Sequence, residues 1–121
     1  MGTNLKELAH KNCKPCEGHV APLSVEEAKK YLAQLPNWQL SFNAKGIFRD
    51  YVMKDFLSAI QLIKQIAEVA ETEDHHPDLH LTGYRKLRID LSTHSIGGLS
   101  ENDFILAAKI EGLPKDLKKS A

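Results

Sequence analysis

The chain is organised around residues 71–103, which read ETEDHHPDLHLTGYRKLRIDLSTHSIGGLSEND. Pro77 ends any helix that reaches it, because the residue before a proline is pushed out of the α region. Two strands are predicted after this proline, over residues 79–84 and 86–93. The second alternates most cleanly, with an apolar side chain or threonine at every second position and polar residues between. This alternation predicts an antiparallel sheet with one buried and one solvent-exposed face.

A long helix is predicted immediately before this stretch, from a cap at Asp55 to about Thr72. One stripe of it is apolar at helical spacing, which predicts the face that packs on the sheet. Further apolar residues lie beside that stripe, so the face is wide enough for a partner subunit as well. The stripe consists of Phe56, Ile60, Ile63, Ala67 and Ala70, and the flanking residues are Leu57, Leu62, Ile66 and Val69.

The remaining elements have their own start and stop signals. Ser24-x-x-Glu27 is a capping box, and the helix it opens is expected to end before Pro36. A hairpin is predicted from residues 38–40 and 47–53. A last helix is expected to begin at Ser100, with Asp103 closing a second capping box, and to end near Gly112.

The predicted order is therefore helix, two strands, helix, two strands, helix. We expect an α+β fold in which a four-stranded antiparallel sheet carries three helices packed on one face. Residues 23–113 form the predicted domain, residues 1–22 a polar extension with a CxxC sequence, and residues 114–121 a charged tail. The chain has no GxGxxG or P-loop sequence, so a nucleotide-binding fold has no support.

Composition excludes several kinds of partner. Among 121 residues, 42% are hydrophobic, and 16 basic residues balance 16 acidic ones. We therefore expect no electrostatic attraction to nucleic acid or to an anionic membrane. No apolar run reaches the length of a membrane span, and no signal sequence is evident, so a cytoplasmic protein is expected.

The two cysteines lie in the polar extension as Cys13-Lys-Pro-Cys16, with His10 and His19 on either side. Cysteine and histidine are zinc ligands, but ordinary zinc modules place a longer loop between the two ligand pairs. Redox CxxC sequences usually follow a strand and open a helix, and this one does not. A structural role is favoured, with metal binding and redox chemistry left as alternatives.

Four of the six histidines gather in residues 71–103: His75, His76, His80 and His94. They have three interpretations. They can be polar loop residues at the ends of elements, or metal ligands together with Asp78. They can also form a metal-free acid–base site, because imidazole exchanges protons near neutral pH.

Three acidic residues near the end of the predicted long helix bear on this question. Glu71, Glu73 and Asp74 lie where the helix dipole is negative, so they cost stability. We infer that at least one of them is retained for a reason other than helix formation.

The pattern Glu71-x3-His75-His76-Pro77-x6-Tyr84-x9-His94-x8-Asp103 resembles the signature of the pterin-4a-carbinolamine dehydratases. The resemblance covers the chain from the Ser24 helix onward. It implies the dehydration of a 4a-hydroxytetrahydropterin to the quinonoid dihydropterin, which recycles the cofactor of aromatic amino acid hydroxylases. It also implies that no metal or organic cofactor is used, that the substrate is a pterin, and that the protein is a homodimer or homotetramer.

The resemblance also assigns residues. It implies catalytic roles for His75, His76 and His94, with His75 and His94 as the acid–base pair and His76 orienting the pterin. Supporting carboxylates are Glu71 and Asp103, and the substrate-binding residues are Asp74, Pro77, Ser92, Thr93 and Ser95.

Animal relatives of this family additionally act as dimerisation cofactors of a homeodomain transcription factor. A protein-interaction module that uses the long helix is therefore the alternative function.

Overall fold

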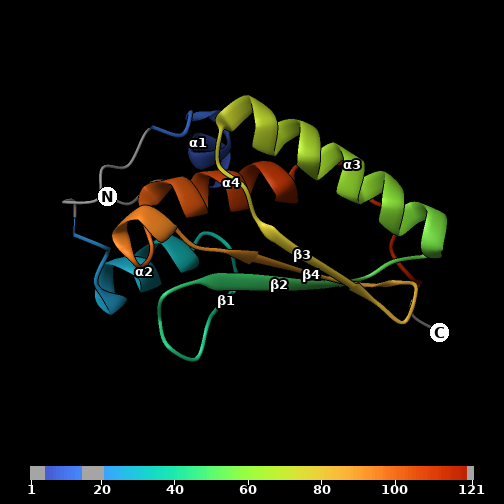
Figure 1. Cartoon of the computed structure of the whole chain (residues 1–121), viewed down its shortest axis with the longest axis horizontal. Helices are drawn as coiled ribbons and strands as arrows, with labels where there is room; N and C mark the ends of the chain where they lie inside the picture. Colours follow the sequence, from blue (N-terminus) through green and yellow to red (C-terminus); the bar gives the residue numbers. More distant parts are fainter. Residues whose placement is uncertain (1–4, 15–20, 120–121) are drawn as a thin grey trace.

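A computed structural model describes residues 5–14 and 21–119 of the chain. Within these residues, four strands and four α-helices follow one another, with a single turn of 3₁₀-helix, η1, before the last α-helix (Figure 1). In chain order they are α1 (Leu5–His10), α2 (Val25–Leu32), β1 (Gln39–Leu40), β2 (Ile47–Val52), α3 (Phe56–Glu73), β3 (Asp78–Thr82), β4 (Lys86–Leu91), η1 (His94–Ile96) and α4 (Glu101–Glu111).

The strands form one antiparallel sheet in the order β1-β2-β4-β3, which confirms the predicted fold class. β4 lies in the interior of the sheet and pairs with β2 from Ile47↔Leu91 to Val52↔Lys86. On its other side it pairs with β3 through a tight hairpin. The α3 crossover therefore carries the chain from β2 past β4 to the far edge of the sheet.

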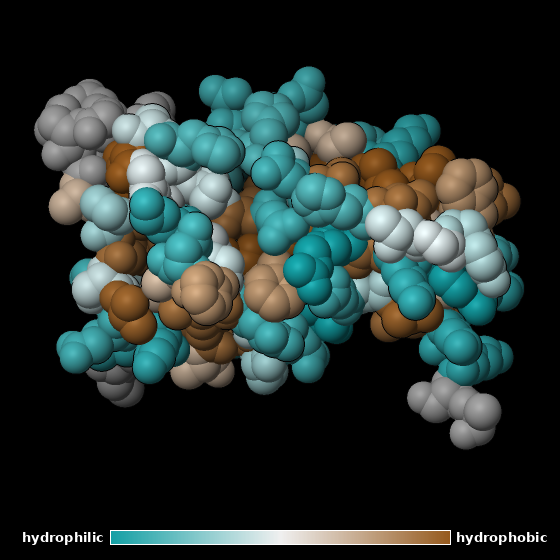
Figure 2. All heavy atoms as spheres, turned by 60° about the horizontal axis from the view of Figure 1, so that its bottom comes forward, coloured by the Kyte–Doolittle hydropathy of each residue, from teal (hydrophilic) through white to brown (hydrophobic). Residues whose placement is uncertain are grey.

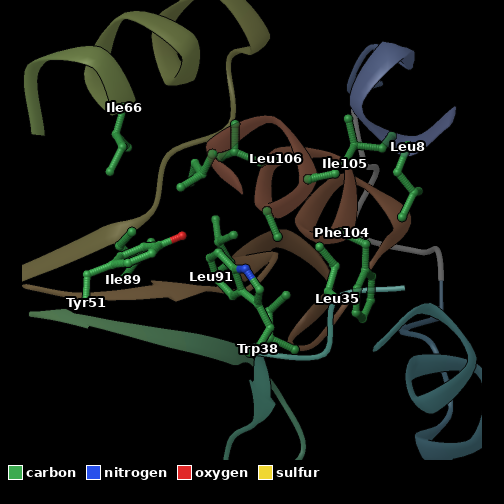
Figure 3. Close-up of a cluster of buried hydrophobic side chains, with 14 of the residues drawn as sticks. Leu8, Leu35, Trp38, Tyr51, Ile66, Ile89, Leu91, Phe104, Ile105 and Leu106 are labelled. Carbon is green, nitrogen blue, oxygen red and sulfur yellow. The ribbon is translucent and has the colours of Figure 1, made fainter. Parts of the chain in front are cut away.

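Helices α3 and α4 cover one face of the sheet (Figure 1). The hydrophobic core lies in that layer, where Ile66 of α3 and Leu106 of α4 point towards Ile89 and Leu91 of β4 (Figure 3). α2 joins this core through Tyr31, whose ring stacks on Phe104 with 4.8 Å between centroids. The predicted alternation of β4 is confirmed, because Leu87, Ile89 and Leu91 are all buried.

The predicted buried stripe of α3 is wrong at Phe56, Ile60 and Ala67, which are exposed. The fully buried residues follow a different line, Ala59, Leu62, Ile66 and Ala70. Phe56 and Ile60 remain 54% and 42% exposed, and Leu57 beside them is 64% exposed. The helix is apolar over more than half of its circumference there, so periodicity alone could not select the face that the sheet covers.

Several boundaries also differ from the predictions. α2 ends at Leu32, and β1 is only two residues long. Gly83 and Tyr84 both have positive φ, 53° and 57°, and form the β3–β4 turn instead of extending the strand. Both predicted capping boxes, at Ser24 and Ser100, are present.

The amino-terminal extension contains a helix that the sequence analysis did not predict. α1 packs on α4, and Leu8 is fully buried in the core (Figure 3). Among the described residues, no helix is long and apolar enough to cross a membrane.

Candidate active site

A cleft of about 650 Å³ opens where the carboxyl end of α3, the β4–η1 junction and the first turn of α4 meet. Most of the candidate residues line it, although they come from separate parts of the sequence. The predicted residues that line it are Asp74, His75, His76, Ser92, Thr93, His94 and Ser95.

The end of α3 places two histidines at this cleft. Asp74 adopts the left-handed conformation (φ 51°) and turns the chain out of the helix, and the His75 N–H then donates to the Ala70 carbonyl. Pro77 prevents further helical turns, so His75 and His76 leave the helix in an extended segment that leads into β3. Pro77 itself does not line the cleft.

Asp103 is fully buried beneath His75. Its Oδ1 lies 2.6 Å from His75 Nε2, and its Oδ2 accepts hydrogen bonds from the Thr93 hydroxyl (2.8 Å) and the Ser100 N–H (3.0 Å). Thr93 and Ser100 hydroxyls are themselves 2.7 Å apart. Because Oδ2 takes both of these donors, Oδ1 is left to accept a hydrogen bond from the imidazole.

This contact sets the chemistry available to His75. When Nε2–H donates to Asp103, Nδ1 is the ring nitrogen that remains to exchange a proton with a substrate. The His75 side chain is only 11% exposed, so its ring is held by packing as well as by hydrogen bonding. Asp103 therefore serves both as a helix cap and as the partner of an imidazole.

The other two histidines are more accessible. His76 Nε2 lies 2.6 Å from Glu71 Oε2, with both side chains largely exposed. His94 begins η1 and is exposed on the cleft. The cleft therefore combines one largely buried, carboxylate-bound imidazole with two exposed imidazoles.

His80 lies elsewhere, on the solvent-exposed face of the sheet, where its Nε2 is 3.2 Å from Asp90 Oδ2. Within residues 5–14 and 21–119, no three histidine, cysteine, aspartate or glutamate side chains are grouped so that they could hold a metal ion. The five-residue metal alternative therefore has no ligand set in this arrangement. Cys16 and His19 of the other metal alternative lie outside the described residues.

Sequence reasoning missed five residues that line the cleft: Cys13, Lys14, Thr72, Glu73 and Asn102. The acidic end of α3 gave a partial signal for one of them. Glu73 accepts a hydrogen bond from the Cys13 N–H (2.7 Å), and Glu71 binds His76, so two of the three acids have partners outside the helix. Nothing in the polar extension indicated that it reaches the cleft.

Residues 21–113 match the family model described as pterin 4 alpha carbinolamine dehydratase. The chain belongs to this family. Two relatives whose assigned name is pterin-4-alpha-carbinolamine dehydratase come from Nitrosomonas europaea and Halorhodospira halophila. The first is 48% identical over 93% of this chain and 98% of its own length. The second is 45% identical over 88% of this chain and 96% of its own.

A solved structure from Brucella melitensis, described as a transcriptional coactivator/pterin dehydratase, is similar in fold and sequence. It superposes with a TM-score of 0.70 and 33% identity, over 74% of this chain and 95% of that one. The family match contains all three cleft histidines and Asp103, whereas α1, Cys13 and Lys14 precede it.

Proposed function

We propose that this protein dehydrates a 4a-hydroxytetrahydropterin to the quinonoid dihydropterin, using the three cleft histidines for acid–base catalysis. By its family the protein is an enzyme of the dehydratase type. The observation that carries the proposal is the pairing of His75 with buried Asp103 in the same cleft as His76 and His94.

The reaction needs an acid because hydroxide is a poor leaving group. The C4a–O bond breaks as the oxygen takes up a proton, and a ring-nitrogen lone pair fills the developing vacancy. A base then removes the proton of that ring nitrogen, which leaves a neutral quinonoid dihydropterin and one water. Each proton transfer by a positioned side chain contributes roughly 10²–10⁴ in rate.

We assign the two transfers to His75 and His94. His75 is held rigidly by Asp103, which suits a group that must meet a fixed atom of the substrate. His94 lines the same cleft and is exposed, so it is accessible to a bound ring. His76, bound to Glu71, is assigned to orienting the pterin together with Asp74, Ser92 and Ser95.

The physiological role that follows is the recycling of the pterin cofactor of an aromatic amino acid hydroxylase in the cytoplasm. A coupled assay tests it, with a phenylalanine hydroxylase, limiting tetrahydropterin and a reductant that returns the quinonoid dihydropterin to tetrahydropterin. We expect this protein to raise the sustained rate of tyrosine formation, because the carbinolamine then no longer accumulates. An unchanged rate, with hydroxylation itself intact, would contradict the proposal.

The exposed start of α3 supports a second role for this helix, in the assembly of several copies of the chain. Phe56, Leu57 and Ile60 are exposed, with Val52 and Leu117 also partly exposed. Hydrophobic side chains gather over this end of the molecule in Figure 2. We propose that a second copy of the chain covers this face, giving a homodimer or homotetramer. Binding of another protein through the same helix is the second candidate function, because it would use the same apolar residues.

A further inference from the structure

The segment that precedes the family domain is fixed to it at several points. Leu8 is fully buried against α4. Lys109 Nζ donates to the Ala9 carbonyl at the end of α1 (2.7 Å), and Lys11 Nζ pairs with Glu101 Oε2 (3.0 Å). The chain therefore leaves α1 along α4, in the direction of the cleft.

Two nearly buried side chains then hold the next residues at the cleft itself. The Asn102 side chain accepts from the Lys14 N–H (2.9 Å) and donates to the Lys14 carbonyl (2.5 Å), as a neighbouring strand would. Glu73 accepts from the Cys13 N–H, and its side chain is only 8% exposed. If the segment moved away, the Asn102 and Glu73 side chains would lose these hydrogen bonds, so the structure favours a fixed position.

Cys13 and Lys14 line the same cleft as the three histidines. We propose that Cys13 and Lys14, anchored to α4 by residues 8–11, form a fixed wall of the substrate cleft, here called the N-terminal wall, which limits the size of the side chain carried by the pterin ring. Asn102 and Glu73 are its positioning residues. This inference rests on the proposed dehydratase function and adds to it a determinant of substrate choice.

The chemistry of the wall suits selection of substrates by their size better than it suits proton transfer. Burial raises the pKa of the Cys13 thiol to about 12, so this side chain is a neutral, space-filling group at physiological pH. The wall lies before residue 21, where the match to the family model begins. A neutral group that lines the cleft is well placed to change which substrate enters and not which reaction occurs.

Steady-state kinetics with two substrates tests the wall. Cys13→Trp fills space at the cleft, and Cys13→Ser is the matched control that leaves it open. For a 4a-hydroxytetrahydropterin with a dihydroxypropyl side chain, we expect Cys13→Trp to raise KM about tenfold or more. For the methyl-substituted substrate the rise should stay below about threefold, with kcat unchanged for both. Equal changes for the two substrates, a loss confined to kcat, or no change would overturn the proposal.

A binding measurement separates failure of the wall from failure of the proposed function. Lys14→Cys, in a background carrying Cys13→Ser and Cys16→Ser, places one reactive thiol on the wall. We expect a 7,8-dihydropterin with the dihydroxypropyl side chain to slow maleimide labelling about tenfold at saturation. Labelling of Lys30→Cys on α2, in the same background, should not change.

The outcomes are distinct. Protection of the Lys14→Cys thiol without any dehydration would refute the proposed reaction and leave the wall in place. Normal dehydration without protection would overturn the wall alone. If neither protection nor dehydration is observed, both the wall and the proposed reaction are overturned.

Discussion

His75 Nε2 and Asp103 Oδ1 lie 2.6 Å apart although 28 residues separate them in the sequence. The contact joins the end of α3 to the first turn of α4. Along the sequence, the β3–β4 hairpin lies between these two segments. Asp103 is fully buried, and the hydrogen bonds from Thr93 and Ser100 fix its second oxygen. The geometry of the proposed catalytic imidazole is therefore a property of the whole fold.

Replacing Asp103 by asparagine should reduce kcat by about 10–100-fold with little change in KM, because the amide no longer holds and polarises the His75 ring. Steady-state kinetics measures both constants, and circular dichroism checks that the variant is folded. Asp90→Asn is the matched control, since Asp90 pairs with His80 outside the cleft. If the two variants retain the same activity, Asp103 acts only as a helix cap.

A second prediction concerns Glu111, whose Oε1 accepts hydrogen bonds from Trp38 Nε1 (2.8 Å), Arg49 Nε (3.1 Å) and the Tyr51 hydroxyl (2.7 Å). Burial alone would raise the pKa of the Glu111 carboxyl, but these hydrogen bonds outweigh it and lower the pKa. Glu111→Gln should therefore lower the free energy of unfolding near neutral pH by about 1–3 kcal/mol.

The pH dependence of this effect has a definite sign. A glutamate whose pKa is lower in the folded state contributes stability that is complete above its unfolded value of roughly 4.3. That contribution disappears as the pH falls through the folded pKa. Urea unfolding at a series of pH values should thus show wild type and Glu111→Gln converging in acid. A constant difference between the two proteins across this pH range would contradict the assignment.

The Cys13 thiol provides a third prediction. Its pKa of about 12 leaves very little thiolate near pH 8, because burial disfavours the charged form. In a Cys16→Ser variant, a disulfide reagent should react with the native protein at least about 100-fold more slowly than with the unfolded chain. Equal rates would show that the Cys13 side chain is not buried against Asn102 and Glu73.

The exposed start of α3 predicts self-association. Light scattering should give wild type the mass of a dimer or tetramer, because Phe56, Leu57 and Ile60 would otherwise stay in water. Leu57→Glu places a charge in this face and should shift the protein to a smaller species. Lys30→Glu on α2 should leave the mass unchanged, and a monomeric wild type would refute the proposed interface.

Local signals explain why much of the fold could be predicted from the sequence. The Ser24 and Ser100 capping boxes, the Asp55 cap and the alternation of β4 each depend on residues a few positions apart, and all are present. The buried face of α3 could not be predicted in the same way, since Phe56 and Ile60 are as apolar as the residues that the sheet covers.

The candidate site likewise contains some residues that could be predicted from the sequence and others that could not. His75, His76 and His94 could be selected from their spacing, because the family pattern specifies them. The contribution of Cys13 and Lys14 could not, since it depends on α1 packing against α4 and on the Asn102 side chain binding the Lys14 backbone. Such long-range contacts leave no periodic signal in the sequence.

The most direct test of the central claim is the rate of 4a-carbinolamine dehydration by wild type, His75→Ala and His80→Ala, measured with EDTA present. His80 is the matched control because its imidazole also pairs with an aspartate, but outside the cleft. We predict that wild type and His80→Ala accelerate the reaction equally, and that His75→Ala, still folded, loses about 10²–10⁴ in kcat. Full activity in His75→Ala, or reversible loss of wild-type activity with EDTA, would contradict metal-free catalysis by the histidine cleft.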